Sequence, residues 1–132
     1  MPHRIDSFYL YQIDLDRKSW KIRVELYDEM LEIEPSTRSR GNVKAYGMCC
    51  YPDKKSVDRR DGVITVIQLW AGARKLDLVA MHESVHAAFE FASTKMWYEA
   101  EERTAKEEHI VRTAEVIYDK LRKKLIERGH LS

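Results

Sequence analysis

Three short stretches of apolar, β-branched and aromatic residues predict β-strands. Residues 7–15, SFYLYQIDL, form the first predicted strand. Residues 43–51, VKAYGMCCY, form the second, which Pro52 ends, and residues 63–70, VITVIQLW, form the third. The third strand is apolar almost throughout, which is typical of a strand in the middle of a sheet. A strand in this place can also offer one edge to an extended peptide, and both alternatives remain open.

Residues 19–34 fit two hydrophobic periods at once. Apolar residues alternate between Trp20 and Leu26, as in a strand, and they also recur at helical spacing as far as Leu31. The acidic residues of this stretch suit the exposed face of a helix, and Pro35 would end it. We therefore predict a helix over residues 19–34, with a longer N-terminal β-hairpin as the alternative.

Apolar residues at intervals of three and four predict two helices, over residues 76–92 and 99–128. The face of the first helix that we expect to be buried consists of Leu78, Val79, Met81, Val85, Ala88, Phe89 and Ala92. The stripe on the second consists of Ile110, Ala114, Ile117, Leu121 and Leu125. Together with the strands, these helices predict the α+β class, with a small sheet of three to four strands packed on the first helix and on a long C-terminal helix. A length of 132 residues suits a single domain over residues 1–132.

The composition argues against several classes of function. With 23 Lys and Arg against 22 Asp and Glu, the formal net charge is +1, so no overall field draws the chain to nucleic acid or to a membrane surface. Residues 53–62 hold four basic and three acidic side chains, and we expect no nucleic-acid contact there. No stretch approaches the roughly 20 apolar residues of a membrane span. The adjacent Cys49 and Cys50 are unsuited to a mutual disulfide, so we expect a reducing, cytoplasmic location.

The predicted helix 76–92 contains the pattern H-E-x-x-H, formed by His82, Glu83 and His86. Residues four apart lie on one face of a helix, so both imidazoles can bind one zinc ion. Glu83 projects beside that face, where a carboxylate can take a proton from a zinc-activated water. This spacing predicts a zinc site with Glu83 as the general base.

A catalytic zinc ion takes three protein ligands, so His82 and His86 need a partner. The longer pattern with a third histidine is absent, because Phe89 follows and the required glycine is missing. Acidic residues at the start of the next predicted helix are the other common solution, and the candidates are Glu101, Glu102, Glu107 and Glu108. Periodicity separates these candidates only in part.

The run HESVHAAFEF, followed about twenty residues later by Glu-Glu-x-Ile-Val, resembles the compact zincin-like metallopeptidases of the glutamate-ligand type, which include small peptidases encoded by phages and prophages. The resemblance implies a Zn²⁺ cofactor, a minimal zincin fold, and a third ligand from a glutamate that opens the following helix. Counting the apolar positions after that glutamate favours Glu108, with Glu107 second. Arg112 stands where some larger relatives carry an aspartate, so the residue that orients a zinc-bound histidine is unassigned. The candidates for stabilising the oxyanion are Tyr98, His109 and Tyr118.

Two functions follow as hypotheses. The first is a zinc metallopeptidase, a hydrolase acting on a peptide or protein substrate, with His82, His86 and Glu108 as metal ligands. The second is a non-enzymatic zinc-binding module that regulates or binds a partner on the same scaffold.

Overall fold

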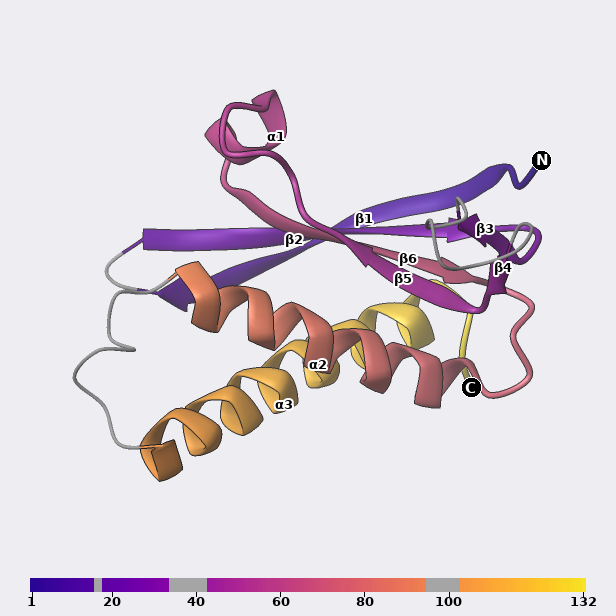
Figure 1. The fold of residues 1–132 in the computed structure, drawn as a ribbon. Helices are drawn as coiled ribbons and strands as arrows, with labels where there is room; N and C mark the ends of the chain where they lie inside the picture. The colour runs from indigo at the N-terminus through magenta and orange to yellow at the C-terminus, as the bar shows by residue number, and fades with distance from the viewer. Residues whose placement is uncertain (16–17, 34–42, 95–102) are drawn as a thin grey trace.

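A mixed β-sheet carries two long helices on one of its faces (Figure 1). The computed structural model describes residues 1–15, 18–33, 43–94 and 103–132. In chain order the elements are β1 (Arg4–Leu15), β2 (Lys18–Tyr27), β3 (Leu31–Ile33), β4 (Val43–Ala45), β5 (Gly47–Cys50), α1 (Val57–Arg60), β6 (Val63–Trp70), α2 (Leu76–Thr94) and α3 (Arg103–Glu127). The predicted α+β class, with a sheet of up to four strands and a long C-terminal helix, is confirmed.

The four-stranded sheet has the order β1-β2-β6-β5. β1 and β2 form an antiparallel hairpin, β2 and β6 are parallel, and β5 runs antiparallel to β6. Strand β6 therefore lies inside the sheet, with Ile67 opposite Val24 of β2 on one side and Cys49 of β5 on the other. Of the two alternatives for residues 63–70, the central strand is correct, and the outer strand beside it is β5.

The predicted helix over residues 19–34 is wrong. Within the described part of this stretch, the chain forms β2 and then β3, which pairs with β4 in a separate two-stranded sheet. The alternating period is the real one, because Ile22, Val24 and Leu26 are fully buried on the helix-covered face while Arg23 and Glu25 take part in polar contacts outside the core cluster. Pairing with β6 decides between the two periods, and this contact spans about forty residues of sequence.

The second predicted strand, residues 43–51, is divided between the two sheets. Val43–Ala45 pairs with β3, whereas Gly47–Cys50 pairs with β6. Tyr46 lies between them, and its carbonyl accepts a hydrogen bond of 2.8 Å from the backbone N–H of Trp70. The charged segment that follows contains the short helix α1, whose Ser56 side chain caps its start, and Gly62 comes after this helix with a φ of 86°.

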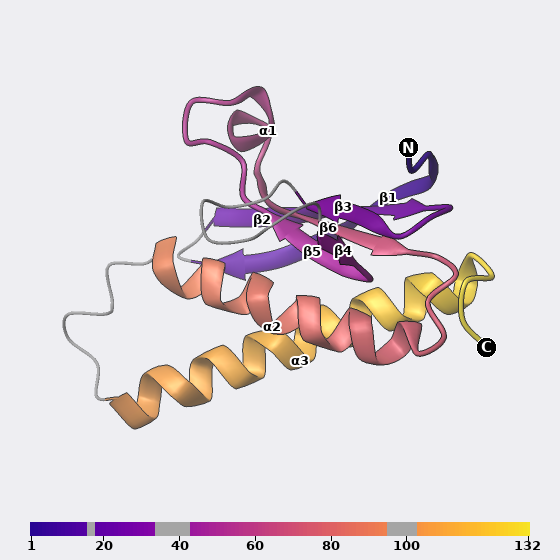
Figure 2. The ribbon, with the colours of Figure 1, turned by 45° about the vertical axis from the view of Figure 1, so that its right-hand side comes forward.

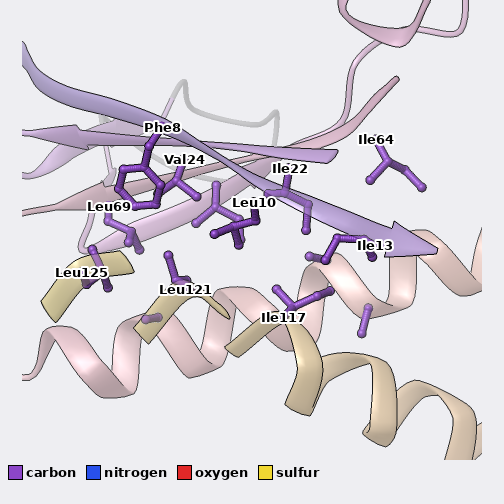
Figure 3. Close-up of a cluster of buried hydrophobic side chains, with 14 of the residues drawn as sticks. Phe8, Leu10, Ile13, Ile22, Val24, Ile64, Leu69, Ile117, Leu121 and Leu125 are labelled. Carbon is purple, nitrogen blue, oxygen red and sulfur yellow. The ribbon is translucent and has the colours of Figure 1, made fainter. Parts of the chain in front are cut away.

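The core fills the space between the sheet and the two helices (Figure 3). Side chains such as Leu10, Val24 and Leu69 project from the strands towards α3. The predicted stripe on the C-terminal helix is confirmed at its buried end, where Ile117, Leu121 and Leu125 are each 0% exposed. None of the helices within the described residues is long and apolar enough to cross a membrane.

The buried face of α2 differs from the predicted one. Ala88 and Ala92 are buried as expected, but Leu78, Met81, Val85 and Phe89 are exposed. The buried residues of the helix are instead mostly small, and these are Ala80, Ser84, Ala87, Ala88 and Ala92, with Leu76 and Phe91 at the two ends. Small side chains allow the helix to approach the sheet closely, so local hydrophobicity does not determine which face is buried.

Candidate metal centre

His82 and His86 lie one turn apart on α2, and their side chains meet. Their Nε2 atoms are 3.2 Å apart, and the two rings meet edge to face with centroids separated by 4.8 Å. Both histidines are exposed, so their nitrogens are accessible from solvent. The predicted convergence of the two imidazoles is therefore present in the structure.

The distance between these nitrogens fits one shared metal ion. Two nitrogens bound to a tetrahedral zinc ion at about 2.0–2.1 Å lie about 3.3–3.4 Å apart. The observed separation of 3.2 Å is close to this value. Neutral imidazole nitrogens are also among the ligands that zinc prefers. The two histidines thus have the spacing and the chemistry of two zinc ligands.

Glu83 is the buried member of the group, at 4% exposure. One ligand atom from each of His82, Glu83 and His86 lies within 4.8 Å of the others. Burial raises the pKa of Glu83, while the charges of the two histidines and a hydrogen bond from Cys49 act in the opposite direction. The carboxyl group therefore stands beside the two imidazoles in a partly dehydrated place.

Strand β5 forms the wall opposite α2. A cavity of about 270 Å³ is lined by the three site residues together with Gly47, Met48, Cys49 and Tyr51. A second cavity of about 340 Å³ continues past Tyr46 and Gly47 along the first turns of α2. The Sγ of Cys49 donates a hydrogen bond of 3.2 Å to the backbone carbonyl of Glu83, and this contact ties the strand to the helix. Burial raises the pKa of Cys49, so the residue stays a thiol.

Tyr51 is a site residue that the sequence did not reveal. Its hydroxyl donates to the backbone carbonyl of His86 at 3.5 Å, and its side chain lines the cavity with the two histidines. Burial and nearby negative charges raise the pKa of Tyr51 to about 12, so the phenol carries its proton at neutral pH. The alternation of the predicted strand contains a partial signal, because residues 47, 49 and 51 share one face. Alternation alone does not place that face against α2, so it could not assign Tyr51 to the site.

The proposed third ligand lies apart from the histidines. Glu108 is exposed on α3, where its Oε1 accepts a hydrogen bond of 3.1 Å from Nε of Arg112. Glu107 lines a different cavity, between α2 and α3. Among the described residues, only His82, Glu83 and His86 form a cluster of three or more potential metal ligands. The assignment of Glu108 stays a prediction, and Glu101 and Glu102 lie outside the described residues.

The oxyanion candidates from the sequence do not line the cavities around the histidines. Tyr118 faces the cavity between α2 and α3, and His109 is exposed on α3. Neither residue is among those lining the two cavities that His82 and Glu83 share. Tyr98 lies outside the part of the chain that the structure describes.

Comparisons with protein families, with curated proteins and with solved structures found no match to this chain. The assignment of the site therefore depends on its geometry. That geometry consists of two converging imidazoles, one buried carboxylate and a strand with a phenol at its end.

Proposed function

We propose that this chain is a zinc-dependent metallopeptidase whose centre is formed by His82, Glu83 and His86. The observation that carries the proposal is the 3.2 Å separation of the two imidazole nitrogens beside Glu83, a residue that is 4% exposed. Two zinc-compatible nitrogens with an adjacent general base are the minimum that metal-assisted hydrolysis requires. The resemblance of HESVHAAFEF to zincin-like metallopeptidases supports the same assignment.

His82 and His86 would hold the ion, and Glu108 is the proposed third ligand, with Glu107 as the alternative. When bound, zinc supplies Lewis-acid chemistry, which polarises a carbonyl group and makes water more acidic. The carboxylate of Glu83 takes a proton from the attacking water and passes it to the leaving amine. The phenol of Tyr51 donates a hydrogen bond to the carbonyl oxygen, where negative charge develops.

Strand β5 would hold the substrate. It is an outer strand of the sheet among the described residues, and it forms one wall of the cavity that contains the histidines. An extended peptide can add to the outer edge of such a strand through backbone hydrogen bonds. We therefore propose a peptide or an extended protein segment as the substrate. A reducing, cytoplasmic location is also proposed, since both cysteines are free.

A second candidate function is a non-enzymatic zinc-binding module that regulates or binds a partner. One observation favours it, namely that Glu108 is paired with Arg112 and is not part of the cluster around the histidines. A site with only two protein ligands would bind zinc weakly and would lack the three-ligand arrangement of catalytic sites. Cleavage assays separate the two candidates.

Metal analysis and peptide cleavage on matched variants test the proposal. We expect one zinc ion per chain in the wild type, loss of zinc in His82→Ala, and retention of zinc in a control variant, His109→Ala. Glu83→Gln should keep zinc and lower the cleavage rate of a peptide library by at least about a hundredfold, because it removes the general base. If Glu108→Gln weakens zinc binding and Glu107→Gln does not, the third ligand is Glu108.

Two results would overturn the assignment. Full cleavage activity in Glu83→Gln would remove that residue from the mechanism. A wild-type protein that binds no zinc under any condition would exclude both candidate functions.

A further inference from the structure

The exposed apolar residues of α2 face an apolar stretch of α3 across a groove. Met81, Val85 and Phe89 line one side, at spacings of four residues. The side that α3 contributes is lined by Ile110, Val111, Ala114 and Tyr118. The cavity between them measures about 600 Å³, more than either cavity beside the histidines. In Figures 1 and 2, the first turns of α3 lie farther from the sheet than its last turns.

The groove is lined mainly by apolar side chains. Phe89 is 54% exposed, Val111 is 50% exposed and Met81 is 46% exposed. Scattered apolar side chains are normal on a protein surface, but a contiguous patch on two neighbouring helices marks a binding site. On α3, Ile110, Ala114 and Tyr118 also pack against the core, whereas Met81, Val85 and Phe89 of α2 are exposed and lie outside the core cluster.

The shape of the groove fits a third helix. On each helix the lining residues recur every four positions, so they form two ridges with a furrow between them. An amphipathic helix that places apolar residues at positions i, i+3 or i+4, and i+7 can fill such a furrow.

The charge around the groove specifies the flanks of that helix. Two acidic side chains of α3, Glu107 and Glu115, line the groove, and no Lys or Arg is among the described residues that line it. The negative end of the α2 dipole, which has no basic residue in its last turn, adds to this field. These two acidic lining residues and the helix dipole favour a cationic partner.

We propose that the groove between α2 and α3 binds an amphipathic α-helix of another protein, with apolar residues on one face and Lys or Arg along its flanks. A second copy of this chain is a poor occupant, because its own basic helical segment, the end of α3, has its apolar face buried in the core at Leu121 and Leu125. An anionic membrane is also disfavoured, because its surface would be repelled by the acidic residues. The proposal does not depend on zinc binding or on peptidase activity.

Binding of a synthetic helix to the full chain tests the proposal. The probe is a fluorescein-labelled peptide of about 18 residues, five helical turns, built only from Leu and Lys with Leu on one face. A scrambled peptide of the same composition and a Leu and Glu peptide are the controls. Fluorescence anisotropy in the presence of EDTA should show saturable binding of the amphipathic Leu and Lys peptide alone, and added salt should weaken it.

Matched variants locate the binding site. The double variant Val85→Ser, Phe89→Ser should raise the dissociation constant at least about tenfold, because it removes one apolar wall. Val116→Ser is the control, since Val116 is 47% exposed on α3 and does not line the groove. Glu115→Lys should weaken binding about two- to fivefold, as expected for a rim charge, and Glu127→Lys should not.

Three results would overturn the proposal. The first is equal binding of the scrambled peptide, or unchanged binding by the double variant. The second is a dimer of the wild type that the double variant dissociates, which would assign the groove to a second copy. The third is binding to phosphatidylglycerol vesicles that the double variant loses, which would assign it to a membrane.

Discussion

Glu83 occupies its place beside the histidines because position 47 of the facing strand has no side chain. A Cβ atom built on Gly47 would lie 2.7 Å from Cγ1 of Val79 and 3.1 Å from Cγ of Glu83. The first of these distances is shorter than real Cβ contacts, and the second is tight. The backbone of β5 therefore approaches α2 so closely that a Cβ atom at position 47 would force the Val79 side chain to shift. This close approach holds the carboxylate between the strand and the two imidazoles.

Gly47→Ala should lower the free energy of unfolding by about 1–3 kcal/mol, the usual cost of overpacking. Urea denaturation measures this change. The same substitution in a Val79→Ala background should cost less, because the nearest clashing atom is then gone. Equal losses in both backgrounds would show that the contact with Val79 is not the cause.

The two long helices use different chemistry to pack on the sheet. Helix α2 presents mainly alanine and serine to β5 and β6, which brings its histidines and Glu83 up to the strand. Helix α3 presents leucine and isoleucine to the core cluster, which also contains side chains of β1 and β2 (Figure 3). The small-residue face positions the site, whereas the large-residue face supplies more of the buried apolar surface.

Leu121→Ala therefore probes the contribution of α3. Leu121 is 0% exposed, and its truncation should cost about 2–5 kcal/mol through lost burial and a new cavity. Val116→Ala on the same helix is the control, and its effect should stay within about 0.5 kcal/mol because the side chain is 47% exposed. Thermal or urea unfolding measures both values. Similar losses in the two variants would mean that the contact between α3 and the sheet is not a main source of stability.

The hydrophobic period of a segment predicts its secondary structure correctly where a single period dominates. Strand β6, helix α2 and the buried stripe of α3 were predicted close to their observed bounds, because each carries a single strong pattern. For β2, helical and alternating spacings coincide, and the parallel pairing with β6 that decides between them is remote in sequence. The position of β5 against α2 is equally remote.

The candidate site likewise contains residues that the sequence predicts and residues that only the fold brings to it. His82, Glu83 and His86 lie within one helical turn and a half, so their convergence follows from helix geometry alone. Gly47 and Tyr51 reach the site only because β5 pairs with β6 and packs beside α2. The buried face of α2 was mispredicted because alanine and serine carry a weak hydrophobic signal, and the exposed apolar residues of the groove carry a strong one.

At the scale of the whole molecule, carboxylates join segments that are far apart in the chain. Asp6 in β1 accepts hydrogen bonds from Arg128 at 2.6 and 2.8 Å and from His130 at 2.8 Å, which ties the first strand to the C-terminal end (Figure 1). The bonds from Arg128 are the largest cause that lowers the pKa of Asp6, and burial opposes them. The bidentate contact with Arg23 likewise lowers the pKa of Asp58, although burial opposes it.

Glu25 forms the most buried of these junctions. The residue is 5% exposed, and its carboxylate accepts hydrogen bonds from four side chains. The donors are Arg4 of β1, Arg23 and Tyr27 of β2, and Gln68 of β6. Burial alone would raise the pKa of Glu25, but the bonds from Gln68 and Tyr27 and the charge of Arg23 lower it below its ordinary value.

These depressed pKa values give the fold a defined response to acid. In the unfolded chain Asp and Glu titrate near pH 3.9 and 4.3, so below about pH 5 the unfolded state binds protons before the folded state does. The stability contributed by Asp6, Glu25 and Asp58 is complete above this range and is lost as the pH falls through their folded pKa values.

Glu25→Gln should reduce the free energy of unfolding at pH 7 by about 1–3 kcal/mol, since it replaces a charged acceptor.

The difference between wild type and Glu25→Gln should shrink as the pH falls from about 5 to 2, because the wild-type carboxylate is then protonated as well. Urea unfolding at a series of pH values measures this convergence. Glu115→Gln is the control, because Glu115 is exposed, and its unfolding curve should follow the wild type at every pH. Parallel loss of stability in wild type and Glu25→Gln down to pH 2 would mean that the charge of Glu25 does not contribute to holding β1, β2 and β6 together.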